Sequence, residues 1–180
     1  ANMTVEMDDT DKLKVLYEDA VKHFGISFEP PDINRGRYRF EPVTDKVIRY
    51  GLGALKGTGE GAIMAIVAAR EEGGPFTSLF DFCVRVDRSR INKRAVEALV
   101  KGGACDCFGV PRAAMLAAIE VVVARAQKKA KDKSSNQVSL LSMAPAVESA
   151  PQPGIGFDCP EASLPEMADD DKLRAEKEAL

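Results

Sequence analysis

Glycines divide the middle of the chain into short helical segments, and this spacing of glycines limits the possible folds more than any other feature. After Gly53, apolar residues recur at helical spacing, which predicts helices near residues 59–72, 78–84, 92–101 and 112–129. Glycine pairs follow two of these segments, Gly73-Gly74 and Gly102-Gly103, as expected where helices end. The apolar stripes are core positions and carry no information on function. The chain is therefore expected to be mainly α.

The region before Gly53 combines one helix with a short β-hairpin. Apolar spacing predicts a helix over residues 11–24, with Thr10 as its N-cap and Gly25 as its stop. Alternating apolar residues at 38–40 and 48–52 flank Thr44-Asp45-Lys46, a pattern typical of a β-hairpin.

Charge is distributed very unevenly along the sequence. The 180 residues contain 25 Lys and Arg against 28 Asp and Glu, a formal net charge of −3. Residues 46–133 hold 16 basic and 9 acidic side chains, a net +7, whereas residues 1–45 carry −4 and residues 134–180 carry −6. Such an asymmetry indicates a polyanion-binding face in the middle segment that the whole-chain charge hides.

Composition excludes several classes of protein. An apolar fraction of 45% is enough for a core, and no apolar run approaches the roughly 20 residues of a membrane span. The sequence has no basic-then-apolar leader, begins without Met and stops inside an expected helix over 167–180. We therefore expect a cytoplasmic piece of a longer protein.

Cysteine and histidine spacing argues against a metal site. The four cysteines, at 83, 105, 107 and 159, form no C-x-x-C pair, and the one histidine, His23, is distant from them in sequence. Free buried thiols of a reducing compartment are the expected state. No cofactor is expected in this chain.

Residues 57–61, Gly-Thr-Gly-Glu-Gly, are the most informative local motif. They join a helix expected to end at Lys56 to one starting near Gly59, so that backbone amides at the helix start are free to bind a phosphate oxygen. The Gly-x-x-x-x-Gly-Lys-Ser/Thr pattern of a Walker loop is not present, and a dinucleotide fingerprint is excluded because the βαβ unit with an acidic residue about 20 positions further on is lacking. A plain helix–helix turn with no ligand remains an alternative. The surrounding positive charge favours DNA, gripped without reading base edges.

Basic side chains around this turn are the candidate phosphate contacts. They are Lys56, Lys93 and Arg94, with Arg85, Arg88 and Arg90 in the same series. Each remains open to a second interpretation as a solvated surface charge.

Longer stretches of the sequence resemble a known family. Residues 48–62 (Ile-Arg-Tyr-Gly-Leu-Gly-Ala-Leu-Lys-Gly-Thr-Gly-Glu-Gly-Ala) are similar to the helix-hairpin-helix region of bacterial DNA polymerase III alpha subunits, the family C replicative polymerases. The resemblance continues in residues 30–34, 74–83, 91–100 and 103–106, and covers residues 8 to about 126.

The resemblance implies a division of the chain. Residues 1–45 would be the end of the fingers region, and residues 46–130 a tandem helix-hairpin-helix domain that holds duplex DNA. Residues 131–165 would be a flexible linker, and residues 166–180 a helix leading to the next domain. The implied DNA contacts of the first hairpin are Lys56, Gly57, Thr58, Gly59 and Gly61, although Thr58 and Ile63 depart from the usual aliphatic residue and Ala.

The second hairpin would centre on residues 101–103 and would add Lys101 and Gly103 as DNA contacts. It lacks the Gly-x-Gly signature of the first. Lys93 and Arg94 complete the DNA-binding set.

A short peptide in the expected linker resembles the sliding-clamp-binding motif, Gln-x-x-Leu-Phe. Here it reads Gln-Val-Ser-Leu-Leu, with Gln137, Leu140 and Leu141 as the expected clamp contacts and Leu141 in place of Phe. The alternative is an apolar cluster that packs back on the domain.

The resulting hypothesis is a non-catalytic DNA-binding and clamp-tethering fragment of a replicative polymerase. Its expected partners are double-stranded DNA, the sliding clamp, and the other domains and subunits of the polymerase. The palm carboxylates and the magnesium of two-metal catalysis would belong to the parent protein. Two alternatives stay open: an accessory region of a helix-hairpin-helix repair nuclease or ligase, and a protein-interaction module that binds no DNA.

Overall fold

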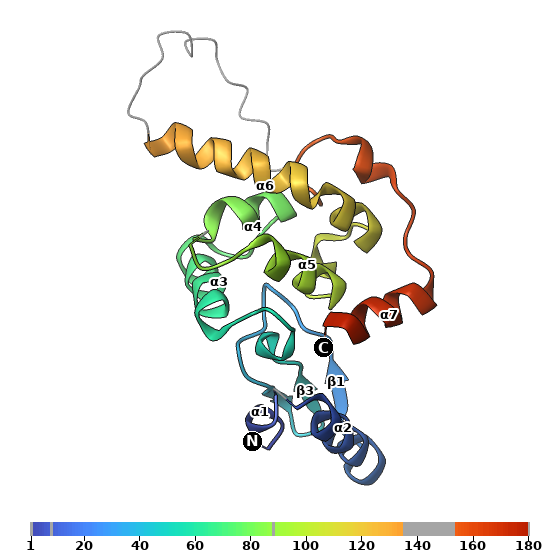
Figure 1. The fold of residues 1–180 in the computed structure, drawn as a ribbon. Helices are drawn as coiled ribbons and strands as arrows, with labels where there is room; N and C mark the ends of the chain where they lie inside the picture. The colour runs from blue at the N-terminus through green and yellow to red at the C-terminus, as the bar shows by residue number, and fades with distance from the viewer. Residues whose placement is uncertain (1, 8, 88, 135–153, 180) are drawn as a thin grey trace, which may run out of the picture.

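The computed structural model describes residues 2–7, 9–87, 89–134 and 154–179, and confirms a mainly helical fold with a small sheet (Figure 1). The α-helices are α1 (Asn2–Val5), α2 (Thr10–Phe24), α3 (Glu60–Gly73), α4 (Leu79–Arg85), α5 (Lys93–Lys101), α6 (Arg112–Ser134) and α7 (Asp169–Ala179). The 3-10 helices are η1 (Leu52–Ala54), η2 (Asp106–Phe108) and η4 (Pro160–Ser163). The strands are β1 (Ser27–Glu29), β2 (Glu41–Thr44) and β3 (Val47–Arg49). No described helix is both long and apolar enough to cross a bilayer.

Helix ends follow local side-chain chemistry. Gly25 ends α2 in the left-handed region, at a φ of 60°, as predicted. The N-cap of α2 is Asp9 rather than the predicted Thr10, because the Asp9 carboxylate accepts the Lys12 N–H at 3.1 Å. Asn92 caps α5 in the same way, accepting the Ala95 N–H at 2.8 Å.

The sheet has three strands in the order β1-β3-β2. β2 and β3 form the predicted antiparallel hairpin, but the strands are shorter than the alternation suggested and exclude residues 38–40. β1 was not predicted; it pairs in parallel with β3, with Phe28 opposite Ile48. Only the distant partner strand makes this three-residue segment regular.

The prediction of a helix that ends at Lys56 is wrong, since only the 3-10 turn η1 precedes the glycine motif. The Leu52 N–H donates to the Arg37 carbonyl at 2.8 Å, and the Gly53 N–H donates to the Tyr38 carbonyl at 3.0 Å. These amides are held by the neighbouring segment and do not enter a longer helix.

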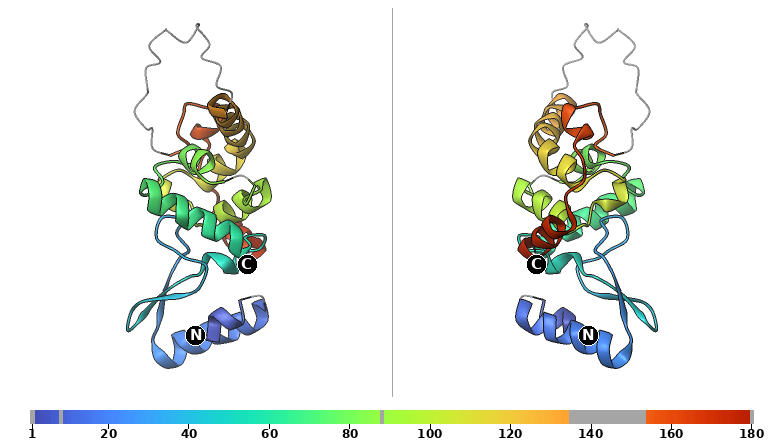
Figure 2. Two further views of the ribbon diagram at one scale, coloured as in Figure 1. Left: turned by 90° about the vertical axis from the view of Figure 1, so that its left-hand side faces the viewer. Right: turned by 90° about the vertical axis from the view of Figure 1, so that its right-hand side faces the viewer.

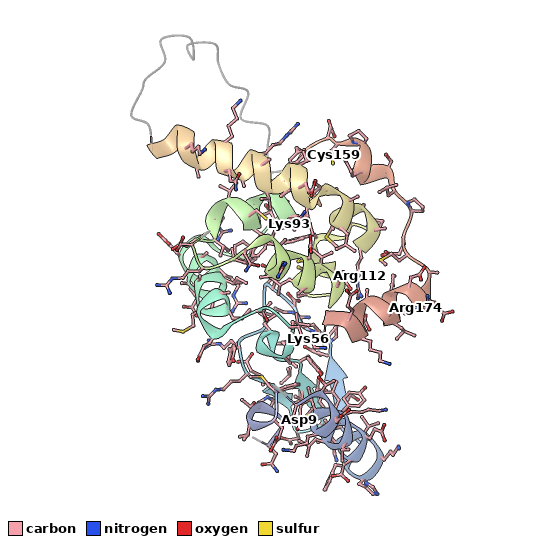
Figure 3. The ribbon with its side chains drawn as sticks, in the orientation of Figure 1. Asp9, Lys56, Lys93, Arg112, Cys159 and Arg174 are labelled. Atoms are coloured by element: carbon pink, nitrogen blue, oxygen red, sulfur yellow. The ribbon has the colours of Figure 1, made fainter. Side chains whose placement is uncertain are left out.

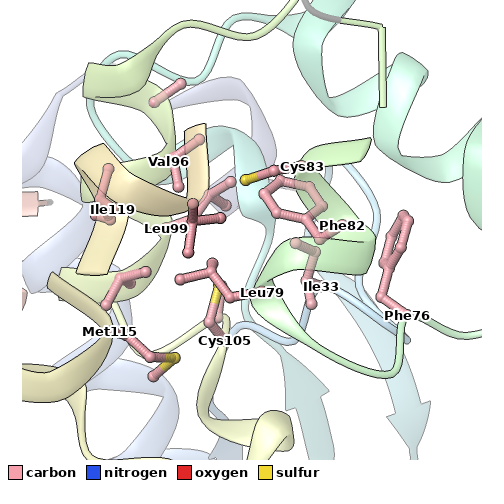
Figure 4. Packing of buried hydrophobic residues seen from close by; sticks show 14 of the residues in the cluster. Ile33, Phe76, Leu79, Phe82, Cys83, Val96, Leu99, Cys105, Met115 and Ile119 are labelled. Carbon is pink, nitrogen blue, oxygen red and sulfur yellow. The ribbon is translucent and has the colours of Figure 1, made fainter. Parts of the chain in front are cut away.

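One main core joins the helices. Figure 4 shows Leu79 and Phe82 of α4 packed near Leu99 of α5 and Met115 of α6, all fully buried. Ile33, which lies before the sheet hairpin, belongs to the same core, and its N–H donates to the Ala104 carbonyl at 2.9 Å. A smaller cluster beside α1 and α2 contains Met3, Met7, Leu13 and Ala54. Figure 2 shows α1, α2 and the sheet at one end of the molecule and the remaining helices at the other.

The chain after residue 153 packs on the helices, in contrast to the flexible linker predicted through residue 165. The Leu79 N–H donates to the Gly154 carbonyl at 2.9 Å, and the Phe80 N–H donates to the Ile155 carbonyl at 3.0 Å. Ile155 is buried, and Arg125 of α6 lies 4.0 Å above the Phe157 ring. The carbonyls of Gly154 and Ile155 thus accept hydrogen bonds from amides at the start of α4 that have no acceptor within that helix.

Candidate nucleic-acid interface

The first hairpin turn, residues 55–59, leads from η1 into α3. Gly57 has a φ of 80°, and Gly59 is the N-cap of α3. A Cβ built on either glycine would meet no atom within 4 Å, so neither is required by crowding inside the protein. Gly57 is required by its left-handed backbone, and both positions leave room for an external group to approach the chain.

Thr58 supports this turn from inside. Its side chain is buried, and its hydroxyl lies 2.8 Å from the Leu52 carbonyl oxygen and 2.5 Å from that of Leu55. Its N–H also donates to the Leu55 carbonyl, at 3.2 Å. The threonine at this buried position therefore ties the turn to the carbonyl oxygens of Leu52 and Leu55.

The start of α3 presents backbone donors. The first amide with a helical acceptor is that of Ala62, which donates to the Gly59 carbonyl at 2.9 Å. The amides of Glu60 and Gly61 precede it, on residues that are exposed. The turn borders an open groove of about 420 Å³, whose lining includes Thr10, Tyr38 and residues 53–59.

Two cations lie beside these donors. The Lys56 side chain is exposed, and among the described residues it makes no ion pair. Arg90 is exposed, and its guanidinium lies 3.9 Å from a Cβ built on Gly61. The structure thus singles out Arg90 from the basic series as a neighbour of the first turn of α3.

The other cations of that series differ in their surroundings. Arg94 is exposed, whereas Lys93 forms ion pairs with Glu97 and Glu120, and its hydrogen bond to Glu120 raises the pKa of Lys93. Arg85 is not a surface cation: it donates to the Ala69 carbonyl at 2.6 Å and to the Gly74 carbonyl at 2.7 Å, at the end of α3. Arg88 lies outside the described residues.

The second hairpin turn, residues 102–111, leads from α5 into α6 and is built around Arg112. This guanidinium is buried and makes two hydrogen bonds to the Asp106 carboxylate, at 2.8 and 2.7 Å. A third bond, at 2.8 Å, reaches Glu176 of α7. The hydrogen bonds to Asp106 and Glu176 outweigh burial and raise the pKa of Arg112 above its ordinary value.

The predicted DNA contacts of the second turn already have partners within the chain. Gly103 is buried with a φ of 81°, and a Cβ there would come within 2.5 Å of Nη2 of Arg112. Lys101 pairs with Glu178 of α7 at 2.9 Å. Figure 3 shows Lys56 and Arg112 both beside the C-terminal end of α7.

The two turns are packed against each other. A Cβ built on Gly102 would lie 2.5 Å from a methyl carbon of Leu55, so the apolar anchor of the first turn seats directly on the backbone of the second. Leu55, Leu99 and Val100 share the main core. The turns therefore form one rigid unit.

Other predicted features are outside this unit. Gln137, Leu140 and Leu141, the proposed clamp contacts, lie outside the described residues. All four cysteines are thiols that form no disulfide with one another; Cys83 and Cys105 are buried, while Cys107 is exposed. In the part of the chain that the structure describes, no group of three or more His, Cys, Asp or Glu side chains is placed to hold a metal ion.

Comparison with known proteins gives a consistent result. A family model described as a helix-hairpin-helix motif matches residues 25–115, which include both turns. The DNA polymerase III alpha subunit of Neisseria meningitidis serogroup B is 45% identical over 172 residues, which is 96% of this chain and 14% of that protein. Those of Vibrio cholerae and Escherichia coli are 38% identical over 186 residues and 40% identical over 143 residues, covering 15% and 12% of those proteins.

Proposed function

Because the chain belongs to the DNA polymerase III alpha subunit family and carries its helix-hairpin-helix region, a DNA-binding fold, we propose that it grips the phosphates of duplex DNA without sequence specificity during chromosomal replication. The observation that carries this proposal is the first hairpin turn. There an open glycine backbone, the first amides of α3 and the exposed cations Lys56 and Arg90 lie together.

These groups suit a phosphate and not a base. Amides at a helix start and cationic side chains favour an anion, and the amides themselves present no pattern of donors and acceptors that matches one base edge rather than another. Gly57 and Gly59 lack side chains that would hold the sugar-phosphate backbone away. Recognition of this kind positions a protein on DNA without reading its sequence.

The chain spans about one seventh of the length of its relatives, at 14% of the Neisseria protein. Nucleotide incorporation, and the magnesium that supports it, are proposed for the longer protein, and no catalytic group is assigned to this chain. The relatives from Neisseria meningitidis, Vibrio cholerae and Escherichia coli are all DNA polymerase III alpha subunits, and for this reason we do not propose a repair nuclease or ligase.

Duplex binding by the 180-residue chain tests the proposal. If about four phosphates are neutralised, log K should fall with log salt at a slope near −3.6, equally for duplexes of unrelated sequence. Lys56→Glu should lower affinity about tenfold or more at low salt, because it replaces an attraction to phosphate with a repulsion.

The matched control for this variant is Lys22→Glu, the same charge change near the far end of α2. It should lower affinity about twofold at most, through net charge alone. Equal losses in the two variants would contradict the first turn as the contact. Binding that does not depend on salt would favour the protein-interaction alternative.

The second part of the proposal is a tether to the sliding clamp through Gln137, Leu140 and Leu141. The supporting observation is sequence alone: a glutamine that can hydrogen-bond at a pocket entrance, followed by two adjacent apolar side chains. Gln137→Ala combined with Leu140→Ala should abolish capture by the clamp of the same bacterium and leave duplex affinity unchanged. Loss of both activities would show that the variant had misfolded, and retained capture would refute the tether.

A further inference from the structure

Carboxylates from the C-terminal part of the chain contact the donors of the second hairpin turn. The Arg112 N–H, at the start of α6, donates to the Glu166 carboxylate at 3.0 Å. The guanidinium of the same residue binds Glu176 at 2.8 Å, and Lys101 binds Glu178 at 2.9 Å. Three separate acidic side chains therefore meet three separate donors of one turn.

These donors are of the same kinds as those of the first turn. Each turn offers an amide at the start of the following helix, a lysine just before the first glycines of the turn, and an arginine nearby. At the first turn Lys56 and Arg90 are exposed, whereas at the second turn each of the three donors has a carboxylate oxygen where a phosphate oxygen would bind.

Helix α7 reaches both turns. While Glu178 pairs with Lys101, the carbonyl of the next residue, Ala179, accepts the Lys56 N–H at 2.6 Å. The last turn of α7 therefore contacts both hairpin turns, in agreement with its place beside Lys56 and Arg112 in Figure 3. The described residues 154–179 contain eight acidic and three basic side chains, a net −5, which duplex DNA would repel.

The three contacts differ in how readily they can open. Arg112 is buried and has a second carboxylate partner, Asp106, which is not part of α7. The Lys101–Glu178 pair is more open, with side chains 29% and 69% exposed. Ion pairs that are exposed to solvent in this way contribute only about 0–1 kcal/mol to the free energy of unfolding. Lys101 is thus the donor that can exchange one anion for another.

We propose that α7 is an intramolecular competitor of DNA. Its Glu178 pairs with Lys101 and thereby prevents the second hairpin turn from binding a DNA phosphate. This inference rests on the proposed DNA binding by the first turn. Under this arrangement the chain binds duplex through one hairpin, and the second joins only when α7 is displaced.

Duplex affinity of the 180-residue chain carrying Glu178→Gln tests the proposal. Because the neutral side chain frees Lys101 and removes a repulsive charge beside it, affinity should rise about threefold to fivefold at low salt. The slope of log K against log salt should steepen by about 0.9, the value for one further phosphate. Asp170→Asn is the matched control, since it removes one negative charge from the exposed start of the same helix.

A second pair of variants isolates Lys101. Lys101→Gln in the otherwise unchanged protein should alter affinity by less than about twofold, because its charge is already paired with Glu178. The same substitution in the Glu178→Gln background should remove the whole gain. Circular dichroism and the unfolding midpoint verify that each variant is folded.

Two results would overturn the proposal. One is an equal gain from Glu178→Gln and Asp170→Asn, which would reflect net charge alone; the other is a Glu178→Gln gain that persists without Lys101. Either result leaves the proposed function intact as long as Lys56→Glu still weakens binding. Failure of the parent protein to bind duplex, or its indifference to Lys56→Glu, would instead refute the proposed function.

Discussion

The two hairpin turns are alike in backbone and opposite in environment. Each contains a glycine in the left-handed region, Gly57 at a φ of 80° and Gly103 at 81°, and each leads into a helix. Around Gly57 the space is open, while Gly103 lies under the Arg112 guanidinium. The same left-handed glycine thus lies in a solvent-exposed turn in one case and in a packed interior in the other.

This difference shows what a count of charges leaves out. Lys56 and Lys101 make equal contributions to the positive middle segment, yet Lys101 is paired with Glu178 from 77 residues further along. A cation to which the fold has already supplied a counter-ion must release that counter-ion before it can bind a phosphate. The contrast between the turns predicts which substitutions act on stability and which act on binding.

The largest expected effect is that of Arg112→Leu on stability. The variant removes the two hydrogen bonds to Asp106 and the bond to Glu176, and leaves both carboxylates without their cation. Because both carboxylates are partly exposed and can be hydrated, the expected loss is about 2–4 kcal/mol, at or below the usual cost of breaking a buried pair. Urea unfolding followed by circular dichroism measures it.

Arg174→Leu is the control for Arg112→Leu. Its guanidinium is 84% exposed and lies 4.0 Å from the Asp171 carboxylate, so the expected loss is below about 0.5 kcal/mol. Similar losses in the two variants would show that the second turn does not depend on its buried arginine.

The glycines give a matched comparison of the two turns. Gly57→Ala introduces left-handed backbone strain only, an expected cost of about 1–2 kcal/mol. Gly103→Ala adds a clash with Arg112 at 2.5 Å to the same strain, and should cost about 2–4 kcal/mol. Unfolding midpoints in urea measure the difference, and a larger loss in Gly57→Ala would reverse the assignment of open and packed turns.

Features fixed by local chemistry could be predicted from the sequence. The helices at 59–72, 92–101 and 112–129 lie within one residue of their true starts, because Gly59, Asn92 and Pro111 mark where the backbone can enter a helix. The end at Gly25 was predicted for the same kind of reason. The glycine motif of the first turn was likewise visible in the sequence alone, whereas the left-handed backbone of Gly57 is seen only in the structure.

Features that depend on distant partners could not be predicted. β1 is ordered by β3, and Gly154 and Ile155 by the free amides at the start of α4, so their own composition gives no signal. The sequence indicates Arg85 only as one of a basic series, because its carbonyl partners, on Ala69 and Gly74, come together only in the folded chain. The ion pair between Lys101 and Glu178 of α7 could not be predicted for the same reason, because its two residues are 77 positions apart in the sequence.

A smaller effect is expected at Glu60, the acidic residue in the first turn of α3. Its carboxylate favours the helix start but repels a phosphate at the neighbouring amides, so Glu60→Gln should raise duplex affinity about twofold and lower stability by a few tenths of a kcal/mol. Glu72→Gln, at the other end of α3, is the matched control for binding. Equal affinity gains would mean that position on the helix does not matter.

The smallest effect concerns pH and the contact between Glu166 and the second turn. Burial raises the pKa of Glu166, but hydrogen bonds from the Met167 N–H, Lys172 and the Arg112 N–H outweigh it and hold that pKa below the ordinary 4.5. A carboxylate with a lowered pKa contributes stability above its unfolded value, and that contribution is lost as the pH falls through the folded value. The unfolding midpoint of Glu166→Gln should therefore lie below that of the parent protein near pH 7 and converge with it as the pH falls through the folded pKa of Glu166. Glu72→Gln provides the reference for a carboxylate without such contacts. A gap that stays constant down to low pH would show that the charge of Glu166 does not hold the C-terminal segment on the second turn, leaving Glu176 and Glu178 as the acidic contacts that do.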